Sequence, residues 1–332
     1  MLKSRKTAAY IALIRECLSL MVHPIDRLLK TQELAMLDKA PSSTSLPVIL
    51  VIGPPRSGST FIYQVLAKTL PVSYLNNFGA LFSNAPLAAS KFFHHFFPNP
   101  LPSLRSYYGN TEKFSDPNDG FSLWNRWLGH DRYAPKREVP QHLKEEMNHF
   151  FHAWTTTFKK PFINKNNRNT TCVDTLASSL DSAYFVFVKR DPVFVAQSLL
   201  LAREEIQGDR KIGWGLGCHQ VAPRHEPDAE LHHVAEQVAW IYSKLEQQMQ
   251  AIPSNRLILV DYESFCHDPN PVVLDIYERI WNNIPGPSRL PKPLQPFQAS
   301  QRIRLPQSEF EQLQRLVQHY LMEYGVNLKL AA

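Results

Sequence analysis

The sequence predicts an α/β fold in which helices cover both faces of a central parallel sheet. Three short apolar runs, at residues 48–52, 184–188 and 256–260, are rich in β-branched or aromatic side chains. Runs of this length and composition are typical of strands that are buried on both faces of a parallel sheet. Helical segments stand between these runs. Strands that alternate with helices indicate a doubly wound parallel sheet.

Length, composition and charge narrow the class of protein. The chain has 332 residues, which is enough for one large α/β domain or two small ones. Hydrophobic residues make up 44% and charged residues 20%, as in ordinary globular domains. The net charge of +6 favours an anionic ligand or an acidic surface as a partner. No run of Lys and Arg is long enough to indicate nucleic acid, so we expect no nucleic-acid partner.

The chain divides into an N-terminal extension, residues 1–47, and a main domain at 48–330. Within the extension, residues 1–30 have helical character and residues 38–47 form a linker rich in Ser and Pro. Within the main domain, the segment from about 80 to 160 is rich in Phe, Trp, His, Pro and Asn. We expect this segment to be an insertion over the sheet edge that shapes an acceptor site. Helical character predicts four further helices, at 61–69, 141–158, 193–205 and 309–324.

The N-terminal apolar stretch does not have the pattern of a membrane anchor. Ala8–Val22 is interrupted by Arg15 and Glu16, and a span needs about 20 apolar residues. The apolar core of a signal peptide also does not contain a charged pair. We expect an amphipathic helix docked on the domain, no integral membrane segment, and at most peripheral association with a membrane. The four cysteines are widely spaced, which argues against a zinc site or a disulfide framework and favours a cytoplasmic location.

The loop after the first apolar run has the pattern of a phosphate-binding P-loop. Two glycines, Gly53 and Gly58, are separated by four residues, and Ser59 and Thr60 follow at the start of a helix. Backbone N–H groups of such a loop, together with the helix N-terminus, stabilise an anion. A nucleotide triphosphatase has Lys where this chain has Ser59, and the cation here comes earlier, at Arg56. The loop therefore suits one phosphate bonded to a sulfate better than a triphosphate bridged by magnesium.

A second anion-binding group follows the second apolar run. Arg190 stands at its carboxyl end, where parallel sheets bind ligands, and its guanidinium group suits a phosphate. Asp191 is suited to cap the next helix, and Pro192 to its first position. Ser198 lies nearly two turns into that helix and could face the same side.

These two motifs resemble those of the sulfotransferase superfamily. The resemblance implies a P-loop-like three-layer fold and an enzyme that uses 3′-phosphoadenosine-5′-phosphosulfate (PAPS) as co-substrate, without a metal. It implies that the loop holds the 5′-phosphate and the sulfuryl group through Arg56, Ser57, Gly58, Ser59 and Thr60. It implies that Arg190 and Ser198 contact the 3′-phosphate. The stretch 162–169 is similar to a segment of bacterial members, from which Lys165 could reach the donor phosphates.

The acceptor proton needs a base, and the resemblance implies an acidic residue before an aromatic stretch. Several bacterial members have Glu at a fixed distance before a Trp-x-Arg-Trp-Leu sequence, and this distance from Trp124 leads to Asp119. Asp119 is therefore the first choice, although Asn-Asp-Gly is also a common turn sequence. Arg56 would neutralise charge on the leaving group. The alternative bases are Glu112, Asp116 and His130.

Two other functions remain open from the sequence. A P-loop kinase or NTPase would need Lys at the Ser59 position and an Asp that holds Mg²⁺, for which Asp174 and Asp261 are loose candidates. A relative that binds PAPS or its product without catalysis is the other alternative.

The acceptor is expected to be a hydroxyl or amine on a small molecule or glycan. The aromatic residues Trp124, Trp127, Tyr107 and Tyr108 suggest a ring-bearing acceptor such as a sugar or a lipid-linked glycan. The sequence carries no indication of the oligomeric state.

Overall fold

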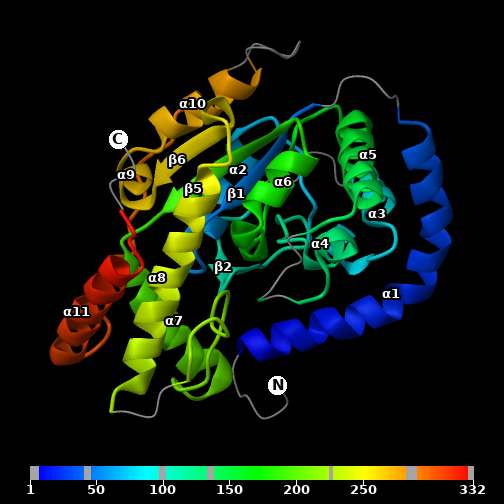
Figure 1. Cartoon of the computed structure of the whole chain (residues 1–332). Helices are drawn as coiled ribbons and strands as arrows, with labels where there is room; N and C mark the ends of the chain where they lie inside the picture. The colour runs from blue at the N-terminus through cyan, green and yellow to red at the C-terminus, as the bar shows by residue number, and fades with distance from the viewer. Residues whose placement is uncertain are drawn as a thin grey trace.

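The computed structural model confirms the α/β prediction (Figure 1). The central sheet consists of four strands in the order β4 (Phe162–Lys165), β1 (Val48–Ile52), β5 (Ala183–Lys189) and β6 (Leu257–Asp261). Each neighbouring pair is parallel, so the carboxyl ends of all four strands lie at one edge of the sheet. The structure describes residues 7–40, 46–96, 102–131, 133, 138–223, 227–281 and 290–327.

Three of the four strands coincide with the predicted apolar runs. β1 has the predicted bounds, β5 is one residue longer at each end, and β6 is displaced by one residue. β4 was not predicted as a strand, because Asn164 and Lys165 interrupt its apolar character. Both polar side chains are nevertheless buried.

Helices cover both faces of the sheet, which makes the fold three-layered as predicted. Alternate residues of β1 point to opposite faces, with Leu50 in one hydrophobic cluster and Val51 in the other. The Leu50 face is covered by α4 (Phe121–Leu128), α5 (Gln141–Phe158), α6 (Val173–Ser179) and part of α8 (Ala229–Met249). The Val51 face is covered by α2 (Ser59–Thr69), α9 (Tyr262–His267) and α10 (Asn270–Trp281).

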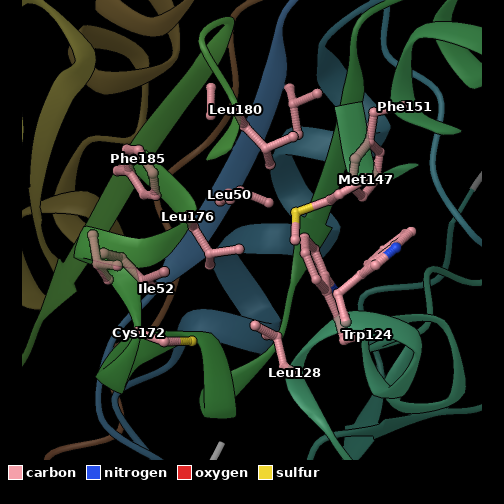
Figure 2. Packing of buried hydrophobic residues seen from close by; sticks show 14 of the residues in the cluster. Leu50, Ile52, Trp124, Leu128, Met147, Phe151, Cys172, Leu176, Leu180 and Phe185 are labelled. Carbon is pink, nitrogen blue, oxygen red and sulfur yellow. The ribbon is translucent and has the colours of Figure 1, made fainter. Parts of the chain in front are cut away.

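Figure 2 shows the cluster on the Leu50 face. Trp124 of α4 and Met147 of α5 lie beside Leu176 of α6, over the strand residues Leu50 and Phe185. Leu87 of α3 (Pro86–Phe96) belongs to the same cluster, so the predicted insertion at about 80–160 supplies three helices to the core. It also contains a short hairpin, β2 (Ser106–Tyr107) and β3 (Asn110–Thr111).

A third hydrophobic cluster joins three helices beside the sheet. α7 (Pro192–Gln207), α8 and α11 (Gln307–Glu323) pack together at the lower left of Figure 1. The α7 N-terminus has the predicted form: the Asp191 side chain accepts a hydrogen bond from the Val193 N–H, and Pro192 is the first helical residue. The helix begins immediately after β5, so its first turn lies at the carboxyl edge of the sheet.

The N-terminal helix α1 (Thr7–Asp38) runs along the outside of the molecule (Figure 1). It extends eight residues beyond the predicted helical region, to the start of the predicted linker, of which residues 41–45 lie outside the described residues. It packs on η1 (Gly79–Leu81) and α3 (Pro86–Phe96). Among the described residues, no helix has both the length and the apolarity that crossing a membrane requires.

Candidate functional site

The predicted phosphate-binding loop leaves β1 at the carboxyl edge of the sheet and leads into α2. Gly58 has a φ of 87°, a left-handed conformation that favours glycine. A Cβ atom at this position would lie 2.3 Å from the Tyr262 ring, so the ring packs directly on the backbone of the loop. At the other end of the loop, the Thr170 hydroxyl accepts a hydrogen bond from the Gly53 N–H (3.1 Å) and donates one to the Gly53 carbonyl (2.9 Å). The loop is thus fixed at both glycines.

The N-terminus of α2 differs from those of the helices that follow β5 and β6. α7 is capped by Asp191, and α9 by Asp261, whose side chain accepts from the Ser264 N–H. α2 begins after Gly58 without a side-chain cap. The N–H groups of its first turn have no partner within the helix and carry the positive end of the helix dipole. An anion can therefore take the place that a capping side chain takes in the other two helices.

Arg56 and Ser198 come together from separate parts of the chain. The Arg56 Nε donates a hydrogen bond of 3.0 Å to the Ser198 hydroxyl on α7. The guanidinium group also lies over the Tyr108 ring, 4.8 Å from its centroid. Burial lowers the pKa of Arg56, and the nearby Arg190 acts in the same direction. A cation that has lost its hydration in this way is stabilised by an anionic ligand.

Arg190 completes this cationic group. One of its Nη atoms donates to the Arg56 carbonyl at 2.7 Å, and the other donates to the Ser300 carbonyl. Its guanidinium lies 4.9 Å from the centroid of the Tyr262 ring. The Glu263 carboxylate is 3.9 Å from its Nε, and burial raises the pKa of this carboxyl group. The two predicted phosphate motifs therefore meet at one place.

Three buried polar atoms at this place have no hydrogen-bond partner within the described part of the chain. They are the Ser57 Oγ, the Arg190 Nε and the Glu263 Oε1. Buried polar groups are rarely left unpaired in folded proteins, because desolvation without a hydrogen bond is costly. The Ser57 Oγ and the Arg190 Nε can each donate a hydrogen bond to an oxyanion, and the Glu263 Oε1 lies 3.9 Å from the Arg190 Nε. The residues therefore fit a ligand that carries phosphate groups.

Asp119 and Lys165 form an ion pair at the same edge of the sheet. The Lys165 Nζ is 2.9 Å from the Asp119 Oδ2; the lysine side chain is 2% exposed and the carboxylate 18%. Lys165 stands opposite Val51 in the strand register, close to the start of the predicted phosphate-binding loop. The Asn166 side chain donates to the Asp119 carbonyl at 3.0 Å and fixes the backbone. In this ion pair, the Asp119 carboxylate remains accessible to solvent or to a ligand.

The alternative bases occupy different environments. Asp116 is fully buried and accepts hydrogen bonds from the Ser103 N–H and hydroxyl and from the Lys113 N–H, so it has the role of a structural turn residue. Glu112 and His130 are exposed. Only Asp119 among the four is both partly buried and paired with a lysine at the sheet edge.

Two of the four aromatic residues that were expected at the acceptor site lie elsewhere in the structure. Trp124 and Trp127 are buried in the core, and the Trp124 Nε1 donates to the Asn164 side chain at 2.7 Å, so neither can line an acceptor site. Tyr108 does lie beside the loop, next to Arg56, and Tyr107 contacts the Tyr108 ring; the hydroxyls of both tyrosines donate to the Glu205 carboxylate. The tryptophans follow Gly120 at helical spacing, and this pattern is equally typical of a buried helix face.

Three further residues lie at the site but were not predicted as site residues from the sequence: Tyr262, Glu205 and Ser300. Tyr262 follows β6 as Arg190 follows β5, and this position after a strand was an available signal. Glu205 and the Ser300 carbonyl reach the site only through tertiary packing. Within the described residues, no group of three or more His, Cys, Asp or Glu side chains could hold a metal ion. Asp261, a candidate magnesium ligand, caps α9 instead.

Comparisons with known proteins bear on the family and the fold of this chain. The model of a sulfotransferase family matches residues 47–281, which is more than half of the chain. The crystal structure of sulfotransferase STF9 from Mycobacterium avium is similar, with a TM-score of 0.51 and 14% identity over 92% of this chain and 78% of that chain.

Sulfotransferase STF1 from Mycobacterium tuberculosis aligns with a TM-score of 0.49 and 17% identity over 92% of this chain and 80% of that chain. The search of curated proteins found no match. The identity to STF9 is low, so that structure supports the fold alone, whereas the family model covers both of the predicted phosphate motifs. The chain belongs to the sulfotransferase family.

Proposed function

We propose that this protein transfers the sulfuryl group of PAPS to a hydroxyl or amine acceptor. One observation carries the proposal: the uncapped N-terminus of α2 lies next to two arginines, Arg56 and Arg190, that come from separate motifs. PAPS carries a 5′-phosphosulfate and a 3′-phosphate on its ribose. Because these anionic groups are separate, two separate cationic groups suit them. A nucleoside diphosphate lacks the second of these anionic sites.

The donor would be held by residues of both motifs. The 5′-phosphate and the sulfuryl group would accept hydrogen bonds from the loop and the first turn of α2, contributed by Arg56, Ser57, Gly58, Ser59 and Thr60. The 3′-phosphate would lie against Arg190 and Ser198. The hydrogen bond between Arg56 and Ser198, 3.0 Å long, supports a donor that spans both groups. Lys165, which lies beside the loop in the sheet register, would contribute further positive charge.

The reaction would be an in-line displacement at sulfur. The acceptor oxygen or nitrogen forms a bond to sulfur while the bond from sulfur to the bridging phosphate oxygen breaks. Asp119 takes the acceptor proton, and Lys165 orients its carboxylate through the 2.9 Å ion pair. Arg56 and the amides of α2 stabilise the charge that develops on the leaving bisphosphate. The products are the sulfated acceptor and 3′-phosphoadenosine-5′-phosphate (PAP).

The acceptor would be a small molecule or glycan with a ring, such as a sugar or a glycolipid headgroup. Tyr107, Tyr108 and Trp214 are partly exposed, and the rings of Tyr108 and Trp214 are 6.5 Å apart. Aromatic faces next to Arg56 suit the flat apolar face of a sugar. An acceptor screen with sugars, glycolipids and simple phenols tests this part; sulfation of phenols alone would exclude a glycan acceptor.

Calorimetric titration with PAP tests the donor assignment. We expect tight binding of PAP, weak binding of ADP and Mg-ATP, and a dissociation constant for PAP that rises about 10- to 100-fold in Arg190→Ala, because hydrogen bonds to charged groups are strong. Arg279→Ala is the matched control: Arg279 pairs with Asp275 and contacts Leu257, at the opposite end of β6.

Each outcome of the titration separates the alternatives. Mg-ATP binding as tight as PAP binding, or no loss in Arg190→Ala, would contradict the donor assignment and favour a kinase or NTPase. Tight PAP binding without turnover of any acceptor, in a protein that also lacks slow PAPS hydrolysis, would indicate a non-catalytic relative.

A further inference from the structure

The outer face of α1 exposes four large apolar side chains over less than three turns. Leu20, Met21, Ile25 and Leu28 are 72%, 74%, 53% and 76% exposed. The spacing places them together on one face of a helix. Single exposed apolar residues are common, but a contiguous group of this kind marks an interaction surface. We call this group of four side chains the α1 outer face.

The opposite face of α1 is already fixed to the protein. Leu18, Val22 and Leu29 pack against Leu81 and Phe82. Two buried carboxylates of α1 hold the start of α3: Asp26 accepts from the Ala85 N–H at 3.0 Å, and Glu33 from the Ala88 N–H at 2.8 Å. The α1 outer face therefore cannot turn inward without breaking these contacts, and it remains available to a partner.

The charges around the α1 outer face have one sign. Between residues 17 and 32 the basic side chains are Arg27 and Lys30, both exposed, with His23 beside them. The only acidic residue in this stretch is Asp26, which is 1% exposed and faces α3. Between residues 17 and 32 the described side chains thus form an apolar surface with a cationic margin, and none of them is an exposed carboxylate.

The shape of α1 adds to this argument. Pro24 lies inside the helix, where it removes a backbone hydrogen bond and bends the axis. Figure 1 shows α1 curving around the molecule, so that its outer side is convex. The apolar side chains on both sides of Pro24 therefore project outward rather than line a groove.

We propose that the α1 outer face binds an anionic lipid surface. Apolar side chains that enter the boundary of the acyl chains, together with basic residues at the headgroups, are the requirements for such binding. A second copy of the chain would bring like charges together at Arg27 and Lys30, and a convex surface offers it little contact. This inference is independent of the proposed sulfuryl transfer, because it involves no residue of the phosphate site.

Flotation with lipid vesicles tests the proposal on the full chain. Vesicles of phosphatidylcholine alone are compared with vesicles that contain phosphatidylglycerol in addition. We expect binding to the anionic vesicles, weaker binding at high salt, and little binding to neutral vesicles. The variant Leu20→Gln/Met21→Gln/Leu28→Gln should lower the partition coefficient at least about tenfold, because three large side chains no longer enter the lipid.

Matched variants make the outcome specific. Met322→Gln replaces an 80% exposed side chain on α11 and should bind like the unchanged protein. Arg27→Gln/Lys30→Gln should weaken binding to anionic vesicles, whereas Lys211→Gln/Arg315→Gln, at two other exposed sites, should not. Unaltered binding by the triple variant would overturn the proposal. So would a dimer in analytical ultracentrifugation that the triple variant converts to monomer, since a second copy would then cover this face.

Discussion

At Gly58, the backbone conformation and a neighbouring ring both require a residue without a side chain. The φ of 87° disfavours an L-residue with a Cβ, and the added atom would lie 2.3 Å from the Tyr262 ring. Gly58→Ala must therefore shift the loop or the ring that packs on Arg190. We expect a dissociation constant for PAP at least about tenfold higher, measured calorimetrically, with a stability cost of about 1–3 kcal/mol.

Gly208→Ala is the control for backbone strain at positive φ. Gly208 has a φ of 80° at the end of α7, but no atom lies within 4 Å of the position of its Cβ. This variant should lose a similar amount of stability while it retains PAP binding. If Gly58→Ala and Gly208→Ala bind PAP equally well, the close packing of Tyr262 on residue 58 has no effect on donor binding.

Asp119 and Asp116 offer a matched pair of acidic residues in one segment. Asp119 pairs with Lys165 and is partly exposed, whereas Asp116 holds a turn through three hydrogen bonds. If Asp119 is the base, Asp119→Asn should lower kcat by about 10²–10⁴-fold with little change in PAP affinity. Asp116→Asn should instead lower the free energy of unfolding. Turnover measured with saturating PAPS, together with urea unfolding, separates the two; full activity in Asp119→Asn would exclude it as the base.

Among the elements, the contact between α1 and α3 depends on a carboxyl group with an unusual pKa. Burial raises the pKa of Glu33 from its ordinary 4.5 to about 7, although the Ala88 N–H and Arg126, 3.7 Å away, act in the opposite direction. The folded protein therefore binds more protons than the unfolded chain between about pH 4.5 and pH 7. The contribution of Glu33 to stability is present below pH 4.5 and decreases as the pH rises through 7.

Glu33→Gln should remove this pH dependence. The amide oxygen can still accept from Ala88, and the side chain remains neutral. Relative to the unchanged protein, we expect the variant to gain about 1–3 kcal/mol of unfolding free energy between pH 5 and pH 8, measured by urea denaturation. Glu145→Gln, at an exposed position of α5, should show no such gain. If the unfolding free energies of the unchanged protein and Glu33→Gln change in parallel between pH 5 and pH 8, Glu33 is ionised over this whole range.

At the scale of the whole molecule, donor binding should stabilise the fold. The residues assigned to the donor come from the loop after β1, from α2, from the position after β5, from α7 and from β4, so a bound ligand connects elements that are far apart in sequence. At a PAP concentration of 100 times its Kd, the free energy of unfolding should increase by about 2.7 kcal/mol. Thermal unfolding should shift upward by several degrees with PAP, remain unchanged by EDTA, and shift clearly less in Arg190→Ala at the same PAP concentration. A PAP-dependent shift that EDTA removes would indicate a metal in the donor site.

The sequence predicted the parts of this protein whose patterns are local. The apolar runs of β1, β5 and β6 fixed the parallel sheet, and the Asp191-Pro192 pair marked the start of α7. The loop from Gly53 to Thr60 and the Arg after β5 led to the sulfotransferase family. Each of these signals depends on neighbouring residues and on the rule that parallel strands present their carboxyl ends together.

Other features were decided only by the tertiary structure. β4 is a strand because its polar residues Asn164 and Lys165 find partners in Trp124 and Asp119, which a local pattern cannot reveal. The same packing buries the tryptophans that were expected at the acceptor site. Burial, pairing and the meeting of Arg56 with Arg190 depend on contacts across more than a hundred residues, and these exist only once the sheet has formed.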